Sequence, residues 1–435
     1  MLAALLVLAV QDPPRVEPGL ERWSAVRIGV SGRLEMHYLH RDDAINQAGG
    51  AVTSSTNAWS GRVNLRLDVE VADRVQGVLE LENRRFDEGL NEPFGQPDEE
   101  YDLTVKQGYI DVPGLPARAF RLRIGVQELT IRNRPHDDAF FLDLGETEGF
   151  FAGFNPAAGR IDVTFDRDVR EAVGARLDWS PLDFLTARAF ALVVGEQGST
   201  EEDEALYGLS VNANLAETMA AWLMGVVVSG GEPDLEQVWT LGAGWNAYFG
   251  RRRDVELFAE AYLQRGTLTD APDRVSKRAF GGQAGGRLSA VEKLWIELAG
   301  AIRTGDEDPG DGTDEAFQSY EYEHRFLILE SAEFGLDVDT NVIVVRGGLG
   351  LGPLEVDGRP LHLRVDVGRF RADETLSGED AWGVETDLTV RWNFNASLTL
   401  AVQAAILAGS DILEAITADR DDEAFAVVGG ADLRF

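Results

Sequence analysis

The last twelve residues, Ala424-Phe-Ala-Val-Val-Gly-Gly-Ala-Asp-Leu-Arg-Phe435, decide the fold class of this chain. Side chains alternate between the two faces of a β-strand. One face here carries an apolar or small residue at every second position from Phe425 to Phe435, while Asp432 and Arg434 lie on the other. A soluble protein has no physical reason to end an amphipathic strand on an uncovered phenylalanine, so the stretch predicts a β-strand with one apolar face and an exposed aromatic residue at its end.

This stretch resembles the last strand of outer-membrane β-barrels, whose terminal aromatic residue is read by the barrel assembly machinery. The resemblance implies that Phe435 is the contact for that machinery and that outer-membrane lipid surrounds the barrel. An edge strand of any protein could also end in phenylalanine by chance. The rest of the chain therefore has to carry the same pattern.

The same two-residue period recurs along the whole chain. Its clearest examples are 237–249 and 382–394, where aromatic and aliphatic residues alternate with polar or small ones. Helical periodicity is nearly absent, so we expect an all-β chain with a single 18-stranded antiparallel barrel. The expected strands are 24–39, 59–71, 75–84, 102–112, 119–128, 170–179, 185–194, 205–215, 219–229, 237–249, 254–264, 278–289, 293–303, 341–352, 360–371, 382–394, 396–407 and 424–435.

The connections between these strands alternate in length. Those after even-numbered strands are mostly short, such as 72–74 and 216–218, and those after odd-numbered strands are mostly longer, notably 130–169 and 304–340. Short turns at one end, long loops at the other and an even number of strands are typical of outer-membrane barrels. Both chain termini are then expected on the short-turn side.

Barrel width decides which face points outward. A barrel of about 16 to 18 strands is too wide for side chains to fill, so it keeps an aqueous lumen and turns its apolar face to lipid. About ten to thirteen residues per strand, at ~3.3 Å rise and ~40° tilt, span ~25 to 33 Å, which matches an outer-membrane apolar band. A β-propeller, the soluble alternative, would need a repeat of four strands per blade, and the sequence has none.

Aromatic residues near the expected strand ends fit the girdles that such barrels place at the two membrane interfaces. They are Trp23, Trp59, Trp179, Trp239, Trp382, Trp392, Phe249 and Phe394.

Composition narrows the location and the partners. A formal net charge of -35 argues against nucleic acid, and the absence of cysteine suits passage through an oxidising compartment. Residues 1–10 hold an apolar run that looks like the core of a signal peptide, with a buried N-terminal helix as the alternative. Since no later run reaches the ~18 apolar residues of a membrane helix, any span must be made of strands. We expect the barrel over 24–435, in the outer membrane of a Gram-negative-type bacterium.

Two loop segments resemble the alginate export family of outer-membrane porins. Residues 123–129, followed by Arg132 and Arg134, are similar to that family's Gly-Arg-Gln-Glu-Leu strand end with a downstream arginine, although Val126 replaces the usual arginine. Residues 305–312, Gly-Asp-Glu-Asp-Pro-Gly-Asp-Gly with Phe317 beyond, are similar to the family's Gly-Asp-x-Asp-Pro-x-Asp-Gly loop. The resemblance implies an 18-stranded barrel that passes an anionic polysaccharide or oligosaccharide.

The polar strand faces are expected to place arginines and carboxylates together in the lumen. Guanidinium forks could hold uronate carboxylates or sugar hydroxyls, or they could pair with carboxylates of neighbouring strands. Arginine accounts for 37 of the 40 basic residues. This bias has two explanations, a functional use of the guanidinium fork and the codon usage of a GC-rich genome. Arg121 and Arg123 are the strongest candidates for contact with a solute. The expected substrate path comprises Arg121, Arg123, Arg132, Arg134, Arg62, Arg66, Arg364 and Arg391.

Several long loops are acidic, and carboxylates at close spacing suit Ca²⁺. Asp306, Asp308 and Asp311 are weak candidates for such a site, and solvated loop tips are the alternative. We expect no other cofactor. His136 beside Asp137 and Asp138 has no recognisable serine or cysteine partner, so we expect no enzyme activity.

Two classes of function stay open, a channel and a structural or adhesive surface barrel. A channel could pass polysaccharide or act as a general diffusion porin for small solutes. We expect a channel, because long loops that carry arginine could fold inward. The 130–169 loop is expected to enter or cap the pore, since it mixes arginines with phenylalanines that can pack against a barrel wall: Arg132, Arg134, Arg160, Arg167, Phe140, Phe141, Phe150 and Phe151.

Overall fold

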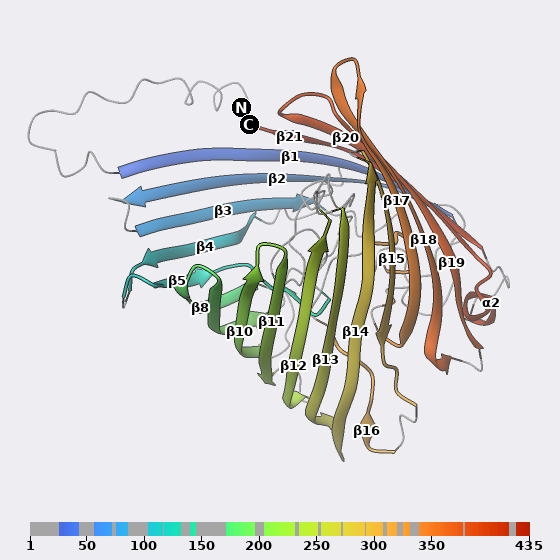
Figure 1. Ribbon diagram of the computed structural model, residues 1–435, viewed down its shortest axis with the longest axis horizontal. Helices are drawn as coiled ribbons and strands as arrows, with labels where there is room; N and C mark the ends of the chain where they lie inside the picture. The colour runs from blue at the N-terminus through green and yellow to red at the C-terminus, as the bar shows by residue number, and fades with distance from the viewer. Residues whose placement is uncertain are drawn as a thin grey trace, which may run out of the picture.

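The structure is a computed structural model, and it forms one closed antiparallel β-barrel (Figure 1). Consecutive barrel strands pair along the chain, and β1 (Val26–Asp42) closes the ring by pairing with β21 (Ala424–Arg434). The expected 18-stranded fold is thereby confirmed. The residues described are 26–42, 56–71, 75–85, 103–115, 117–131, 140–144, 171–195, 204–230, 235–250, 254–270, 273–291, 293–307, 311–319, 325–330, 338, 340–376, 379–416 and 423–435.

The other barrel strands match the expected ones to within a few residues, apart from longer ends on the side of the long loops. They are β2 (Thr56–Val71), β3 (Val75–Arg85), β4 (Leu103–Pro113), β5 (Phe120–Val126), β8 (Glu171–Leu182), β9 (Leu185–Gly195), β10 (Glu204–Ala216), β11 (Met219–Gly230), β12 (Leu235–Phe249), β13 (Val255–Asp270), β14 (Asp273–Val291), β15 (Leu294–Arg303), β17 (Val342–Val356), β18 (Arg359–Leu376), β19 (Glu379–Asn393) and β20 (Leu398–Ala408).

Four short elements lie in the long connections: β6 (Leu129–Ile131), β7 (Leu142–Leu144), β16 (Thr313–Asp314) and α2 (Asp411–Ile416). In the described part of the chain, no helix has both the length and the apolar character needed to cross a membrane.

The chain end is part of the barrel wall. The backbone N–H of Gly32 donates to the Phe435 carbonyl at 2.9 Å, and the Phe435 N–H donates to the Gly32 carbonyl at 3.0 Å. Phe425, Leu433 and Phe435 are exposed on the outer surface, whereas Asp432 is buried on the inner side. The expected separation of this last strand into an apolar outer face and a face that carries Asp432 is therefore confirmed.

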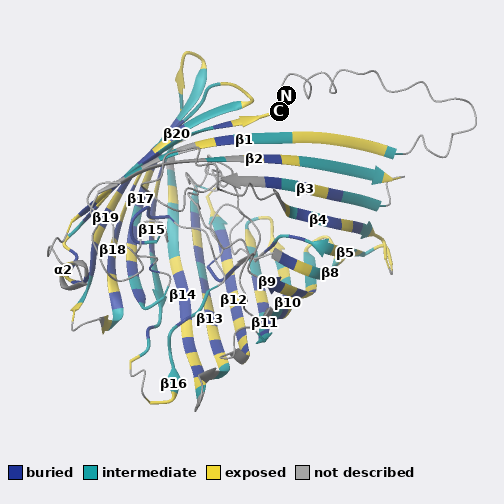
Figure 2. Ribbon diagram, turned by 180° about the vertical axis from the view of Figure 1, so that it is seen from behind, coloured by how far each residue is buried: buried dark blue, intermediate teal, exposed yellow. Residues whose placement is uncertain are grey.

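The outer surface of the barrel is apolar, and the inner side carries the polar residues. Figure 2 shows buried and exposed residues alternating along the strands. Ile28, Leu223 and Leu241 are all more than half exposed, while charged residues such as Glu35, Glu385 and Asp387 are buried. An apolar exterior around a closed barrel of this size is the arrangement of an outer-membrane protein, which agrees with the expected location.

One expected lipid-facing residue, Trp382 of β19, points inward instead. Its side chain is 8% exposed and belongs to an apolar cluster inside the barrel. A β-bulge explains the reversal: Phe370 of β18 pairs with Gly383, the next pair is Arg371 with Ala381, and Gly383 has a φ of 107°. Trp382 is the extra residue of this bulge, and the local change of backbone direction turns its side chain to the inner face. Trp179, Trp239 and Phe249 are exposed outside as expected. Trp23 and the side chain of Trp59 lie outside the described residues.

The inner face is not polar throughout, contrary to the sequence expectation. Toward the long-loop side it becomes apolar, as in β11, where Trp222, Met224, Val226 and Val228 are buried. In β21, Ala424, Ala426 and Val428 precede the polar Asp432. Apolar inner walls are stable only if something covers them, and segments of the two longest connections do so.

Candidate functional site

The first inward segment comes from the connection between β5 and β8. Phe140 and Phe141 pack on Tyr262, a buried residue of the inner face of β13, with ring centroids 5.5 Å and 5.4 Å apart. Both rings also meet Phe317 of the second long connection, at 5.9 Å and 6.2 Å. The two connections therefore meet inside the barrel. This confirms for its described part that the 130–169 loop enters the pore, whereas its Arg132 and Arg134 lie outside the described residues.

The second inward segment, residues 325–330, is here termed the latch segment. The backbone N–H groups of Ile328 and Leu329 donate to the Glu385 carboxylate at 2.6 Å and 2.9 Å, and the N–H of Leu327 donates to Asp387 at 3.1 Å. Both carboxylates are buried on the inner face of β19. They satisfy backbone groups that would otherwise be costly to bury.

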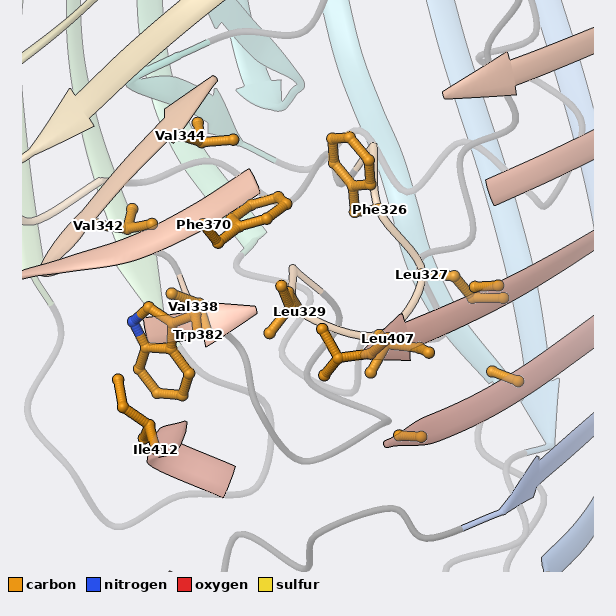
Figure 3. Close-up of a cluster of buried hydrophobic side chains, with 14 of the residues drawn as sticks. Phe326, Leu327, Leu329, Val338, Val342, Val344, Phe370, Trp382, Leu407 and Ile412 are labelled. Carbon is orange, nitrogen blue, oxygen red and sulfur yellow. The ribbon is translucent and has the colours of Figure 1, made fainter. Parts of the chain in front are cut away.

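Apolar side chains hold the other side of the latch segment. Figure 3 shows Phe326, Leu327 and Leu329 among inward residues of the wall, including Phe370 and Leu407. The Phe326 and Phe370 rings meet edge to face with centroids 5.0 Å apart. This packing covers the apolar inner wall between β17 and β21.

Arg325 fixes the start of the latch segment to the wall. Its guanidinium donates to Glu297 of β15 at 2.6 Å and to Asp366 of β18 at 2.8 Å and 3.0 Å. Arg364 donates to the same Asp366 carboxylate. These four charges balance one another, and all four side chains are buried. Arg364, expected on the substrate path, is thus enclosed beneath the latch segment.

A different arrangement lies on the opposite part of the wall, where four arginines share two aspartates. Arg123 donates to Asp111 of β4 at 2.9 Å, and the Arg121 guanidinium lies 3.4 Å from the same carboxylate. Arg176 of β8 and Arg188 of β9 donate to Asp178 at 3.1 Å and 2.7 Å. Arg121, Arg123, Arg176 and Arg188 are termed the four-arginine cluster.

The four-arginine cluster has an excess of positive charge and is partly open to water. Four guanidinium groups on two carboxylates leave a formal charge of +2. The Arg121 side chain is 53% exposed, and Arg188 is also accessible, whereas Arg123 and Arg176 are largely buried. The Arg123 guanidinium lies 3.8 Å from the centroid of the Tyr109 ring, a cation–π contact that helps to fix its position. Exposed guanidinium forks next to fixed ones can bind a carboxylate or phosphate.

The remaining expected path residues have partners of their own. Arg66 donates to Asp68 of its own strand at 3.0 Å and 3.2 Å and to Glu80 of β3 at 3.2 Å, and the contact with Glu80 is the cross-strand pairing left open as the alternative. Arg391 donates to Asn393 at 2.9 Å. The Arg62 side chain lies outside the described residues.

The barrel seam, where β21 meets β1, carries a smaller group of arginines and carboxylates, in which Arg33 also pairs with the buried Glu35 at 2.5 Å. Arg33 donates both ends of its guanidinium fork to Asp432 at 3.1 Å, and Arg434 donates to Asp432 at 3.0 Å. Asp432 is buried, so this carboxylate joins the first and last strands on the inner side.

The acidic loops give no metal centre among the described residues. No group of three or more histidine, aspartate or glutamate residues in that part of the chain could hold a metal ion. Asp311 accepts the Thr313 N–H at 2.7 Å within a turn, and Asp308 lies outside the described residues. At the loop-side rim, partial desolvation and the charges of Asp373, Glu307 and Glu315 raise the pKa of Glu374. A Ca²⁺ site stays a prediction.

Sequence reasoning missed the latch segment and Arg325. The available signal was the run Phe326-Leu327-Ile328-Leu329, four consecutive apolar residues within a largely acidic connection. Such a run in a loop indicates that the segment is buried against another surface.

Compared by sequence, the chain matches no protein-family model and no curated protein. Its fold, in contrast, is shared by solved outer-membrane porins of the Occ/OprD group. Acinetobacter baumannii OccAB1 aligns with a TM-score of 0.59 at 12% identity, over 94% of this chain and 96% of that one.

Two further structures align similarly. Acinetobacter baumannii OccAB4 has a TM-score of 0.58 at 11% identity, over 93% of this chain and 97% of that one. Pseudomonas aeruginosa OprD has a TM-score of 0.52 at 13% identity, over 94% and 95%. At these identities the likeness shows the porin fold, and it gives no support to the alginate export family in particular.

Proposed function

We propose that this chain is an outer-membrane channel for small hydrophilic solutes and that it prefers anions. The observation that carries the proposal is the four-arginine cluster, with its formal charge of +2 on a water-accessible part of the lumen wall. The porin fold supports the channel function, and the cluster supports the preference. No enzyme activity is proposed.

The exposed residues of the lumen wall support a solute path along the N-terminal strands of the barrel, from β1 to β5. Besides Arg121, the ion pair between Arg27 of β1 and Glu70 of β2 is exposed, with side chains 70% and 41% accessible. The wall around Glu297, Asp366 and Glu385 is instead covered by the latch segment. A lumen narrowed by two inward segments suits small solutes better than a long polymer.

The overall charge of -35 does not oppose an anion preference. Much of the acidic excess lies in loops, where charges are screened over ~8 Å at physiological salt. Charges inside a narrow lumen with low-dielectric walls act more strongly on a passing ion. The acidic loops therefore influence approach to the pore, and the cluster influences passage.

Passage of an anionic polysaccharide is the second candidate. The observation that favours it is Phe317, which follows the Gly305–Gly312 segment and lies buried inside the barrel beside Phe140 and Tyr262. The loop that resembles the alginate export family thus contributes to the lumen. Oligouronates distinguish this candidate, because a polysaccharide channel must be blocked by them.

Single-channel recording in planar bilayers tests the proposal. The purified barrel should give stable conductance steps in KCl, and short organic dicarboxylates should reduce the current more than uncharged sugars of similar size do. Block by long oligouronates at lower concentrations than dicarboxylates would favour the polysaccharide candidate. A protein that inserts without conductance steps would overturn the channel function and favour a structural or adhesive barrel.

A further inference from the structure

Two arginines project from the outer surface of the barrel, away from the lumen. Arg265 of β13 and Arg278 of β14 lie directly opposite each other in the sheet register, and both are exposed. They share their strand faces with the exposed Leu263 and Phe280, whereas the neighbouring Gln264 is buried inside. Both guanidinium groups therefore belong to the membrane-facing side.

The pair lies where the apolar outer surface ends. From the short-turn end of β13, the outward residues are Val255, Leu257, Ala259, Ala261 and Leu263, and then Arg265. Val255 and Arg265 are ten positions apart in the strand, which is ~25 Å at ~3.3 Å per residue and ~40° tilt, the height of an outer-membrane apolar band. On β12, Trp239 lies directly opposite Arg265 and is exposed, as interfacial tryptophans are. The pair thus lies at the membrane interface on the long-loop side.

Like charges directly opposite each other across two strands destabilise a sheet. Within the part of the chain that the structure describes, neither Arg265 nor Arg278 has a hydrogen-bond or ion-pair partner. Arg371 on the outer face of β18 differs, because it pairs with Asp380 at 2.6 Å. An anion between Arg265 and Arg278 would offset their repulsion.

We propose that Arg265 and Arg278 together bind a phosphate group of a phosphorylated glycolipid in the outer leaflet, with Trp239 beside its apolar part. Opposed residues of an antiparallel pair have Cβ atoms only ~4.5 to 5.5 Å apart, so two guanidinium forks can reach one phosphate. The site depends on the membrane-embedded fold and not on the channel activity proposed above.

Native mass spectrometry of the detergent-purified protein with added diphosphorylated lipid A tests this site. The wild type should retain one lipid A molecule in preference to phosphatidylcholine. Arg265→Gln with Arg278→Gln should weaken that binding at least ~10-fold, which corresponds to ~1.4 kcal/mol. Replacing both residues by lysine should give an intermediate affinity, because the charge is kept and the fork is lost.

Arg369→Gln is the matched control. Arg369 is also exposed on the outer face at the end of an apolar run, but its partners in the register are Val345 and Val384 instead of a second arginine. Its replacement should change lipid A affinity by less than ~3-fold, about half of the binding free energy expected for the pair.

The heat-dependent change in gel mobility verifies that each variant forms a folded barrel. If the double variant fails to fold, the single Arg278→Gln variant replaces it. The proposal is overturned if the glutamine variants bind lipid A as the wild type does. It is also overturned if Arg369→Gln weakens lipid A binding as much as the double glutamine variant does, or if phosphatidylcholine displaces bound lipid A as well as free lipid A does.

Discussion

Arg123 of β5 lies directly opposite Arg176 of β8, so two arginines form one cross-strand pair on the lumen wall. The pair is stable because Asp111 and Asp178 lie on either side, at 2.9 Å from Arg123 and 3.1 Å from Arg176. Each aspartate also contacts a second, more exposed arginine. In this cluster two carboxylates hold four guanidinium groups, and anion preference is the expected consequence.

Asp178→Asn should increase the anion preference of the pore. The substitution raises the formal charge of the cluster from +2 to +3, because Arg176 and Arg188 both lose their carboxylate. The readout is the reversal potential in a salt gradient. Asp183→Asn, at an exposed position in the neighbouring turn, changes the net charge equally and should leave the reversal potential unchanged. Equal shifts in the two variants would show that total charge, and not the cluster, sets selectivity.

Glu385→Ala should loosen the latch segment. It removes the acceptor of the Ile328 and Leu329 N–H groups, and each buried group left unsatisfied costs about 1 to 3 kcal/mol. The expected result is a higher mean conductance with more frequent current fluctuations. Glu414→Ala, on the exposed surface of α2, serves as the control. Identical traces for the wild type and the Glu385 variant would contradict the assigned position of the latch segment.

Phe435→Ala should impair assembly in cells but not closure of the barrel in detergent. Alanine keeps the backbone hydrogen bonds between residue 435 and Gly32, which extend the pairing of β1 with β21, whereas it removes the exposed ring that is the expected contact for the assembly machinery. The amount of folded protein in the outer membrane and the yield of refolding in vitro are measured side by side. Leu433→Ala, two residues earlier on the same lipid-facing side, is the control. A parallel loss in both assays would assign the ring a purely structural role.

Gly350→Ala should destabilise the barrel by about 1 to 3 kcal/mol, the usual cost of overpacking. A Cβ at this position of β17 would overlap the Trp295 ring, and that ring supports the Arg287 guanidinium, 4.1 Å from its centroid. The urea midpoint of unfolding provides the measurement. Gly29→Ala is the comparison, since its added Cβ would make only an ordinary contact with Asp68. Equal midpoints for both variants would mean that Trp295 moves aside freely.

The barrel could be predicted from the sequence because each strand has to present an apolar face to lipid. Leu241 and Leu263 therefore repeat the same period on adjacent strands. Trp382 escaped this rule because it is itself the extra residue of a bulge beside Gly383, and the two-residue alternation of the sequence continues through the bulge unchanged. The apolar run 326–329 indicates that the latch segment is buried, but its position was not predictable, since loops carry no periodic pattern and the wall carboxylates that accept its backbone N–H groups, Glu385 and Asp387, lie on the distant strand β19.

The candidate site was predictable only in part. The alternation of side chains between the two faces of a strand was enough to place Arg121 and Arg123 in the lumen, where both contact Asp111. The same alternation placed Arg364 in the lumen. It could not show that Arg325, from a loop, would bind Asp366 together with Arg364 and enclose both. Which lumen arginines stay open to solute depends on loop packing, and that is decided by contacts between residues far apart in the sequence.

The most direct test of the proposed channel is the reversal potential of single wild-type pores in a KCl gradient, compared with pores carrying Arg121→Gln and Arg123→Gln. The account predicts a sign that reports preference for chloride in the wild type and its loss in the double variant, because the formal charge of the cluster falls from +2 to zero. A wild-type pore that prefers potassium, or a double variant with an unchanged reversal potential, would contradict it.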